Sequence, residues 1–126
     1  MTTTPGRPDT EAGVATIWAA AVVAVLVGLL VVGVAVAGAV AARHRAEAAA
    51  DLAALAAASY AVHGTETACE RARHIARRMG AEITTCRFDG WNALVTTRVR
   101  IDVPVVESSW VEGRARAGAA SSTQPT

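Results

Sequence analysis

The chain has 126 residues, of which 52% are hydrophobic but only 4% aromatic, and its formal net charge is +1. This nearly neutral charge gives no general electrostatic attraction for nucleic acid, so we expect no nucleic-acid partner. The scarcity of aromatic residues predicts a thin hydrophobic core, and the length allows one small domain besides any membrane segment.

A polar leader, residues 1–13, opens the chain; it contains proline and glycine and shows no hydrophobic periodicity. Residues 14–42 follow without a charged side chain. At about 1.5 Å per residue this run reaches roughly 43 Å as a helix, more than the ~30 Å hydrocarbon core of a bilayer. Because backbone groups in lipid must be hydrogen-bonded within their own segment, the run predicts a single transmembrane helix over residues 14–42, surrounded by membrane lipid.

A cleavable secretory signal is the alternative interpretation of this segment. The apolar region of a signal peptide has about 7–15 residues and follows a basic stretch. Here the run is about twice as long, and Arg7 is the one cation before it. Both features favour a retained anchor.

The helix is expected to continue through residues 43–62, because neither glycine nor proline occurs there and alanine is the best helix former. One apolar stripe of this extension should be covered by the domain or by a neighbouring subunit. The stripe comprises Ala48, Leu52, Leu55, Ser59 and Val62.

A second, short helix is predicted over residues 66–79, with Gly80 as its stop. Its apolar side contains Cys69, Ala72, Ala76 and Met79. A basic cluster lies largely opposite, and we interpret it as a solvated face, with contact to anionic lipid or an acidic partner as the alternative. The cluster is Arg71, Arg73, His74, Arg77 and Arg78.

After Gly80 the hydrophobic period changes from 3.6 to 2, which indicates strands. Asp89-Gly90 predicts a two-residue hairpin turn between strands at residues 83–88 and 91–103, and residues 110–117 form a third strand beyond Pro104. The predicted class is therefore α+β: one long membrane helix that continues into a domain, residues 43–117, with a short helix and a small antiparallel sheet. Residues 118–126 are expected to be a disordered tail.

The two cysteines of the chain fall in elements whose apolar sides should meet. Cys69 lies on the apolar side of the short helix, and a hairpin that pairs Cys86 with Ala93 turns Cys86 to the apolar face of the sheet. In an oxidising compartment this geometry predicts a Cys69–Cys86 disulfide, stabilising the domain by about 3 kcal/mol. In a reducing compartment the two residues would be small core side chains.

No constellation of residues predicts catalysis or a bound cofactor. A metal site from His63, Cys69, His74 and Cys86 has neither CxxC nor HxxxH spacing. The sequence also has no phosphate-binding glycine loop and no nucleophile elbow. We expect no enzyme, no cofactor and no metal.

Several segments, in this order, resemble one family. They are GVATIW at residues 13–18, the long apolar helix, HRAEAAADLAAL at residues 44–55, the cysteine pair and RARAG at residues 114–118. This conjunction resembles the TadE/TadG-like proteins of the bacterial tight-adherence (Flp) pilus and secretion system. The resemblance implies a pilin-like or pseudopilin-like subunit in the cell membrane, with an extracytoplasmic C-terminal domain. It also implies that other pilin subunits and the assembly platform are its partners.

The resemblance further implies processing by a prepilin peptidase. Cleavage between Gly13 and Val14 would leave Trp18 where relatives have a glutamate as fifth mature residue, whereas cleavage after Gly6 would place Glu11 there. We favour Gly13. Without the glutamate, which would neutralise a neighbour's terminal amine inside an apolar filament, a minor or assembly-associated subunit fits better than a major pilin.

Two alternatives remain open at this stage. One is a bitopic envelope protein whose small domain binds a partner without any filament. The other is a cytoplasm-facing regulator, because Arg43, Arg45 and later arginines outnumber the cations of the leader and the positive-inside rule would keep them in the cytoplasm.

Overall fold

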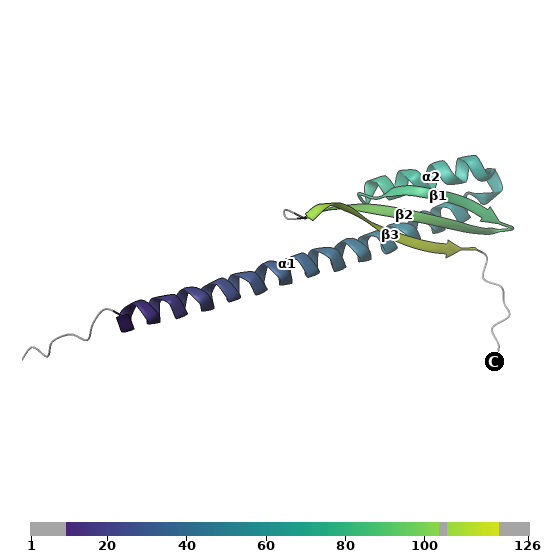
Figure 1. Cartoon of the computed structure of the whole chain (residues 1–126). Helices are drawn as coiled ribbons and strands as arrows, with labels where there is room; N and C mark the ends of the chain where they lie inside the picture. The colour runs from purple at the N-terminus through teal and green to yellow at the C-terminus, as the bar shows by residue number, and fades with distance from the viewer. Residues whose placement is uncertain (1–9, 104–105, 119–126) are drawn as a thin grey trace, which may run out of the picture. The chain divides into compact units, whose positions relative to one another are not determined.

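The computed structural model describes residues 10–103 and 106–118. Its elements, in order, are α1 (Thr10–Ser59), the 3₁₀ helix η1 (Ala61–His63), α2 (Thr65–Arg78), β1 (Glu82–Asp89), β2 (Asn92–Val103) and β3 (Val106–Ala117). The strands form one antiparallel sheet in the order β1-β2-β3 (Figure 1). This arrangement confirms the predicted α+β class. Most of the predicted leader and tail, and Pro104, lie outside the described residues.

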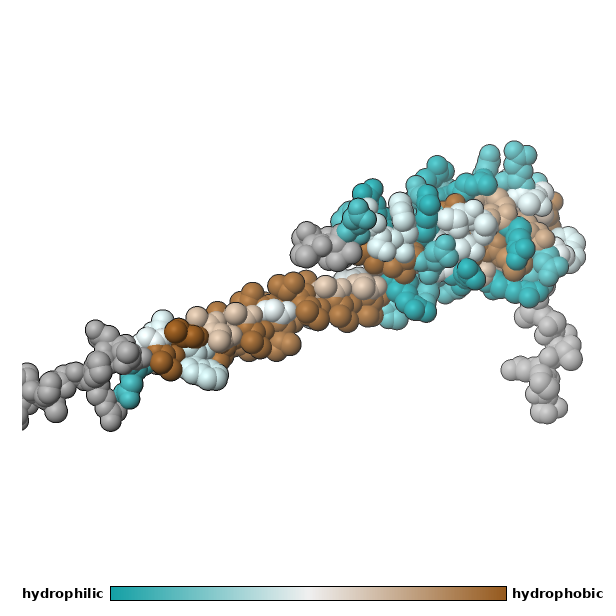
Figure 2. Space-filling view, in the orientation of Figure 1, coloured by the Kyte–Doolittle hydropathy of each residue, from teal (hydrophilic) through white to brown (hydrophobic). Residues whose placement is uncertain are grey.

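The first compact unit of the chain, residues 1–37, contains the apolar part of α1. Its large side chains are exposed; Leu30, for example, is 67% exposed. Figure 2 shows an almost uninterrupted hydrophobic surface on this part of the helix. Among the described residues, one helix is long and apolar enough to cross a membrane. A surface of this kind needs an apolar environment, which supports the expected membrane anchor.

Helix α1 differs from the prediction at both ends. It begins at Thr10, so Gly13 lies inside it rather than before it. The predicted unbroken continuation beyond residue 42 is confirmed as far as Ser59, where α1 ends three residues before the predicted Val62. The chain tightens there into a 3₁₀ turn, in which the His63 amide donates to the Tyr60 carbonyl at 2.9 Å. Such a turn is a common way for an α-helix to finish.

Helix α2 has the apolar side predicted for it. Ala68, Cys69, Ala72 and Ala76 are buried. Gly80, with φ +73°, adopts the left-handed conformation that follows many helices. The amides of Gly80 and Ala81 donate to the carbonyls of Arg77 and Ala76 at 3.0 and 2.9 Å, a Schellman motif. The predicted stop at Gly80 is confirmed.

The hairpin register differs from the prediction. Cys86 pairs with Val95, not with Ala93, and Asp89 pairs with Asn92. The turn residues are therefore Gly90 and Trp91, and Gly90 takes φ +60°, as the first central residue of a type II′ turn does. Because the partner changes by two positions, Cys86 stays on the face that carries Ala93 and Val95.

Strand β3 begins at Val106, four positions before the predicted Trp110, because it pairs with β2 as far as Val103. In this register Val111, Gly113 and Ala115 lie opposite Val99, Thr97 and Val95. Their side of the sheet is the one that faces the core. The alternate residues of β3, among them Trp110, Glu112 and Arg114, are exposed on the other face.

The core of the second unit, residues 38–126, is built mainly from alanine. The alanines of α1 that are fully buried are Ala46, Ala49, Ala50, Ala53, Ala54 and Ala57. The predicted stripe was therefore the wrong face to expect under the domain: Leu52 is 47% exposed and Leu55 60%. Small side chains let the backbones of helix and sheet approach closely, which bulkier leucines would prevent.

Candidate assembly surfaces

The disulfide joins α2 to β1. The structure bonds Cys69 to Cys86, with Cα atoms 5.9 Å apart and a sequence separation of 17. Cys69 is buried on the apolar side of α2, and Cys86 is half-buried on the inner face of the sheet. The helix period and the strand period thus bring the two residues together where the sequence placed them.

A close contact between β3 and α1 sets how the helix meets the sheet. A Cβ atom built on Gly113 would overlap the Ala46 carbonyl group and lie 2.6 Å from the Glu47 amide nitrogen. Only glycine fits there. Beside it, the buried Thr97 hydroxyl donates to the Ala46 carbonyl oxygen at 2.7 Å. The sequence reasoning missed both residues, although a glycine inside a strand often marks the close approach of another backbone.

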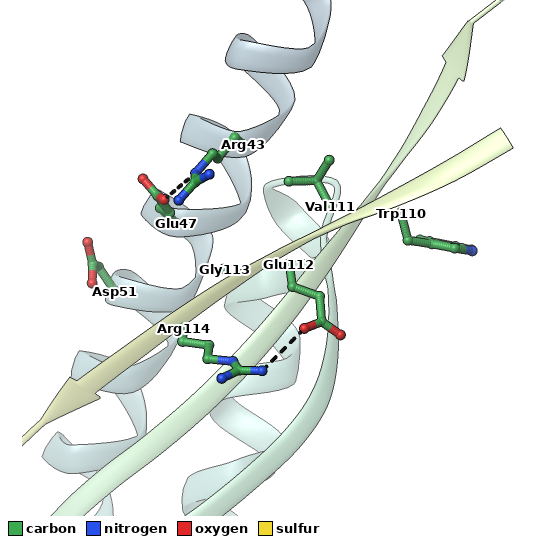
Figure 3. Close-up of a pocket in the computed structure, with 8 residues that line it drawn as sticks. All are labelled: Arg43, Glu47, Asp51, Trp110, Val111, Glu112, Gly113 and Arg114. Atoms are coloured by element: carbon green, nitrogen blue, oxygen red, sulfur yellow. Dashed lines mark hydrogen bonds and ion pairs between the residues drawn. The ribbon is translucent and has the colours of Figure 1, made fainter. Parts of the chain in front are cut away.

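A groove of about 740 Å³ runs between α1 and β3 (Figure 3). Figure 3 shows Arg43, Glu47 and Asp51 along one side of α1, and Glu112 and Arg114 on β3. A second hollow of about 480 Å³, lined by Asp51, Leu55 and the end of β3, shares Asp51 with it. Strand β3 is an edge of the sheet, so the groove lies along backbone groups that no other described strand pairs.

The charges of this groove are almost all paired within the chain. Arg43 contacts Glu47 at 3.0 Å, and Arg114 contacts Glu112 at 3.6 Å. Asp51 is exposed and has no ion pair with any residue in the described part of the chain. An uncompensated carboxylate therefore stands where the groove meets the exposed leucines of α1.

Those leucines belong to what we call the α1 ridge: Arg45, Ala48, Leu52, Leu55 and Ser59, all of them exposed. Arg45, like Asp51, has no ion pair among residues 10–103 and 106–118. The ridge lies on the side of α1 away from the buried alanines. The domain leaves this apolar face uncovered.

The sequence argued against a metal site and interpreted the basic cluster of α2 as a solvated face. Within the described ranges, no group of three or more histidine, cysteine or acidic residues could hold a metal ion. The arginines of the basic cluster on α2 are exposed, and Arg71 lies over the Tyr60 ring at 5.4 Å. The exposure of these arginines agrees with the predicted solvated face of α2.

The predicted processing residues both lie in α1. Gly13 and Val14 are helical and exposed, and a Cβ atom on Gly13 would meet nothing within 4 Å. Cleavage between them would require the first turn of the helix to unwind. Whether the leader is removed stays a prediction.

An apolar helix long enough to cross a membrane, which continues into a small disulfide-bonded α+β domain, indicates a membrane-anchored protein. Residues 13–59 match the family model described as "Putative Flp pilus-assembly TadE/G-like". The resemblance expected from the sequence is confirmed over that segment.

One curated relative adds to this match. The protein of Mycobacterium tuberculosis (strain ATCC 25618 / H37Rv) named "Apoptosis inhibitor Rv3654c" is 56% identical over 46 residues, which are 36% of this chain and 55% of that protein. The chain thus spans about half the length of the curated relative it matches. No solved structure matches the chain significantly.

Proposed function

We propose that the protein is a minor pilin-like or pseudopilin-like subunit of an Flp (tight-adherence) pilus or a related secretion system. In this proposal residues 14–42 span the cell membrane, and residues 43–117 form an extracytoplasmic domain that acts in assembly. The observation that carries it is the family match over residues 13–59, which coincides with a helix that contains both the apolar run and the alanines of the domain core. Its partners would be other pilin subunits and the assembly platform.

The orientation proposed here is supported by the cysteine pair. Cys69 and Cys86 are bonded in the structure, and disulfides persist in oxidising compartments outside the cytoplasm. The arginines after residue 42 oppose this orientation under the positive-inside rule. A direct topology measurement therefore tests the proposal.

The topology experiment uses intact cells and a membrane-impermeant maleimide, with and without reductant. We expect labelling of Cys69 and Cys86 only after reduction, because both thiols would be oxidised and outside. The Cys69→Ser/Cys86→Ser variant is the control for background labelling. Free thiols that react only after lysis, without reductant, would reject the extracytoplasmic placement.

The role in assembly is tested by deletion and complementation. Loss of the gene should abolish or reduce pili or secretion, and the wild-type chain should restore them. In the same assay Gly13→Val should leave membrane insertion intact but block incorporation, if the leader is cleaved between Gly13 and Val14 by a pilin-type peptidase. N-terminal sequencing that finds the uncleaved leader in active complexes would overturn the processing step alone.

A second candidate function is a bitopic envelope protein whose domain binds a partner without any filament. The name of the mycobacterial relative, an apoptosis inhibitor, favours it, since that name describes an action on another process. The match covers 36% of this chain, so it leaves most of the chain without a counterpart. Unchanged pili in the deletion strain would favour this candidate.

A further inference from the structure

The sheet has a second face, on the side away from the core, which we call the outer face. Both α1 and α2 contact the inner face. Side chains of the outer face alternate along each strand with those of the core. The strand register brings six of them into two neighbouring rows. One row is Arg87, Leu94 and Arg116, and the other is Thr85, Thr96 and Arg114.

A hollow of about 290 Å³ lies within these rows, and its lining includes Thr85, Arg87, Leu94, Thr96 and Arg114. Leu94 is half-buried and gives the hollow an apolar centre. Arginines flank it on both sides, Arg87 on β1 and two others on β3, and these strands are roughly 10 Å apart across β2. The hollow is therefore apolar in the middle and cationic at two opposite sides.

The guanidinium groups beside the hollow are those that the chain leaves without hydrogen bonds. Elsewhere on the outer face, Arg98 and Arg100 donate to carboxylates at 2.9 and 3.1 Å. Arg114 and Arg116 approach carboxylates only at 3.6 and 3.8 Å, beyond hydrogen-bond distance. The exposed Arg87 side chain has no ion pair or hydrogen bond with any residue in the described ranges. Free guanidinium groups fit carboxylates, which they bind through two N–H donors.

The apolar centre and the hydroxyl groups indicate which kind of anion fits the hollow. Leu94 offers an apolar contact between the arginines, which an aliphatic side chain matches, whereas a sugar ring or a lipid headgroup would bring polar groups against it. The hydroxyls of Thr85 and Thr96 donate to no residue in the described part of the chain. They are available to the peptide groups of an extended chain, which, unlike those of a helix, are not paired internally.

We infer that this hollow binds an extended acidic segment of a partner protein, in which an apolar side chain stands between two carboxylates. The apolar side chain packs on Leu94. The carboxylates accept hydrogen bonds from Arg87 on one side and from Arg114 or Arg116 on the other. Alternate residues of an extended chain point to the same side about 6.8 Å apart, so acidic, apolar and acidic residues at alternate positions form the smallest matching pattern.

Fluorescence anisotropy with the full-length chain, reconstituted in nanodiscs of uncharged lipid, tests the site. The probe is the labelled peptide Ser-Glu-Thr-Val-Thr-Glu-Ser, and its matched control carries glutamine in place of both glutamates. We expect saturable binding of the probe, about ten-fold tighter than that of the control and weaker at high salt, because the contacts are ionic. Equal binding of the two peptides, or no binding of the probe, would overturn the inference.

Substitutions of single arginines locate the binding. Arg87→Gln should weaken binding of the probe about five-fold, because it removes the guanidinium on the β1 side. Arg87→Lys keeps the charge but not the pair of donors, so it should retain part of the affinity. Arg77→Gln, an equal change on the exposed face of α2, is the matched control and should have no effect. An equal loss in Arg77→Gln and Arg87→Gln would show attraction by net charge alone and overturn the site.

Two other classes of ligand are compared in the same assay. Alginate, a polymer of uronic acids, and vesicles of phosphatidylglycerol compete with the probe, and we expect both to bind less tightly than the probe does. A competitor that binds more tightly and loses affinity with Arg87→Gln would overturn the protein ligand. The assay uses no pilus machinery and the deletion strain uses no peptide, so failure of this inference and failure of the proposed function are observed separately.

Discussion

Two stretches of the same helix use apolar residues in opposite ways. In residues 14–37 the large side chains, valine and leucine, are exposed. Between Ala46 and Ala57 the buried side chains of α1 are all alanine, while Leu52 and Leu55 point outward. The chain thus places large apolar side chains on faces that its own domain leaves exposed, and small side chains at the contact with its own sheet.

This contrast shows that size, not hydrophobicity alone, decides which face of α1 is buried. The sheet approaches the helix so closely that Gly113 has no room for a Cβ atom. A leucine at the contact would have to separate the two layers. The following predictions test the contrast, from the largest expected effect to the smallest.

Ala57→Asp should destabilise the domain by about 3 to 5 kcal/mol, because it buries a charge without a partner. Leu55→Asp, two positions away and exposed, should change the stability by about 0.5 kcal/mol or less. Urea unfolding of the full chain in detergent micelles, followed by tryptophan fluorescence, measures both. If Leu55→Asp proved the more damaging change, the assignment of the covered face would be wrong.

Cys86→Ser should lower the stability by about 3 kcal/mol, since the bond closes a loop between α2 and β1. Reductant should lower the stability of the wild type by a similar amount and leave the variant unchanged. The same unfolding assay applies, with the Cys69→Ser/Cys86→Ser double variant as control. A double variant much less stable than either single one would show that the thiols contribute by packing instead.

Gly113→Ala should destabilise by about 2 to 3 kcal/mol, because the new methyl group overlaps the backbone of Ala46. Gly38→Ala adds the same methyl group to α1 with nothing within 4 Å, so it should leave the stability equal or higher. Urea midpoints of the two variants are compared with the wild type. Equal midpoints for both would contradict the close approach.

Thr97→Val should cost about 1 kcal/mol, the net value of the hydrogen bond to the Ala46 carbonyl. Thr96→Val, on the other face of the sheet, is the matched control and should have a smaller effect. Hydrogen exchange at the amides near Ala46 gives a second measurement, and faster exchange is expected only for the Thr97 variant. No difference between the two variants would remove Thr97 from the contact.

Features set by local rules could be predicted from the sequence. The alanine-rich stretch without a helix breaker predicted the continuation of α1, and Gly80 predicted the end of α2. The alternation of apolar and polar residues in β2 predicted which face of the sheet is buried. The predicted disulfide was correct although the predicted hairpin register was not, because a shift of two positions keeps Cys86 on the same face of the sheet. The turn was predicted at Asp89-Gly90 but lies at Gly90-Trp91. Both dipeptides contain the glycine that a two-residue turn requires, so the sequence did not distinguish them.

The covered face of α1 could not be predicted in the same way. Alanine occurs on nearly every side of this helix, so the hydrophobic periodicity singled out the leucines. Nothing in the local sequence indicates whether an apolar stripe is covered by its own domain or by another chain. The groove and the Gly113 contact depend on pairing between β2 and β3 and on helix packing, which bring together residues more than fifty positions apart. Such long-range contacts leave only weak marks in a single sequence.

The alanine face has a mechanical consequence. Moving α1 by one turn, about 5.4 Å, along its axis would replace each buried alanine by another alanine, so this surface offers little resistance to sliding. The hydrogen bond from Thr97 to Ala46 and the fit of Gly113 exist in one position only. These two contacts therefore fix the position of α1 on the sheet, and we expect a pull along the helix to load them first.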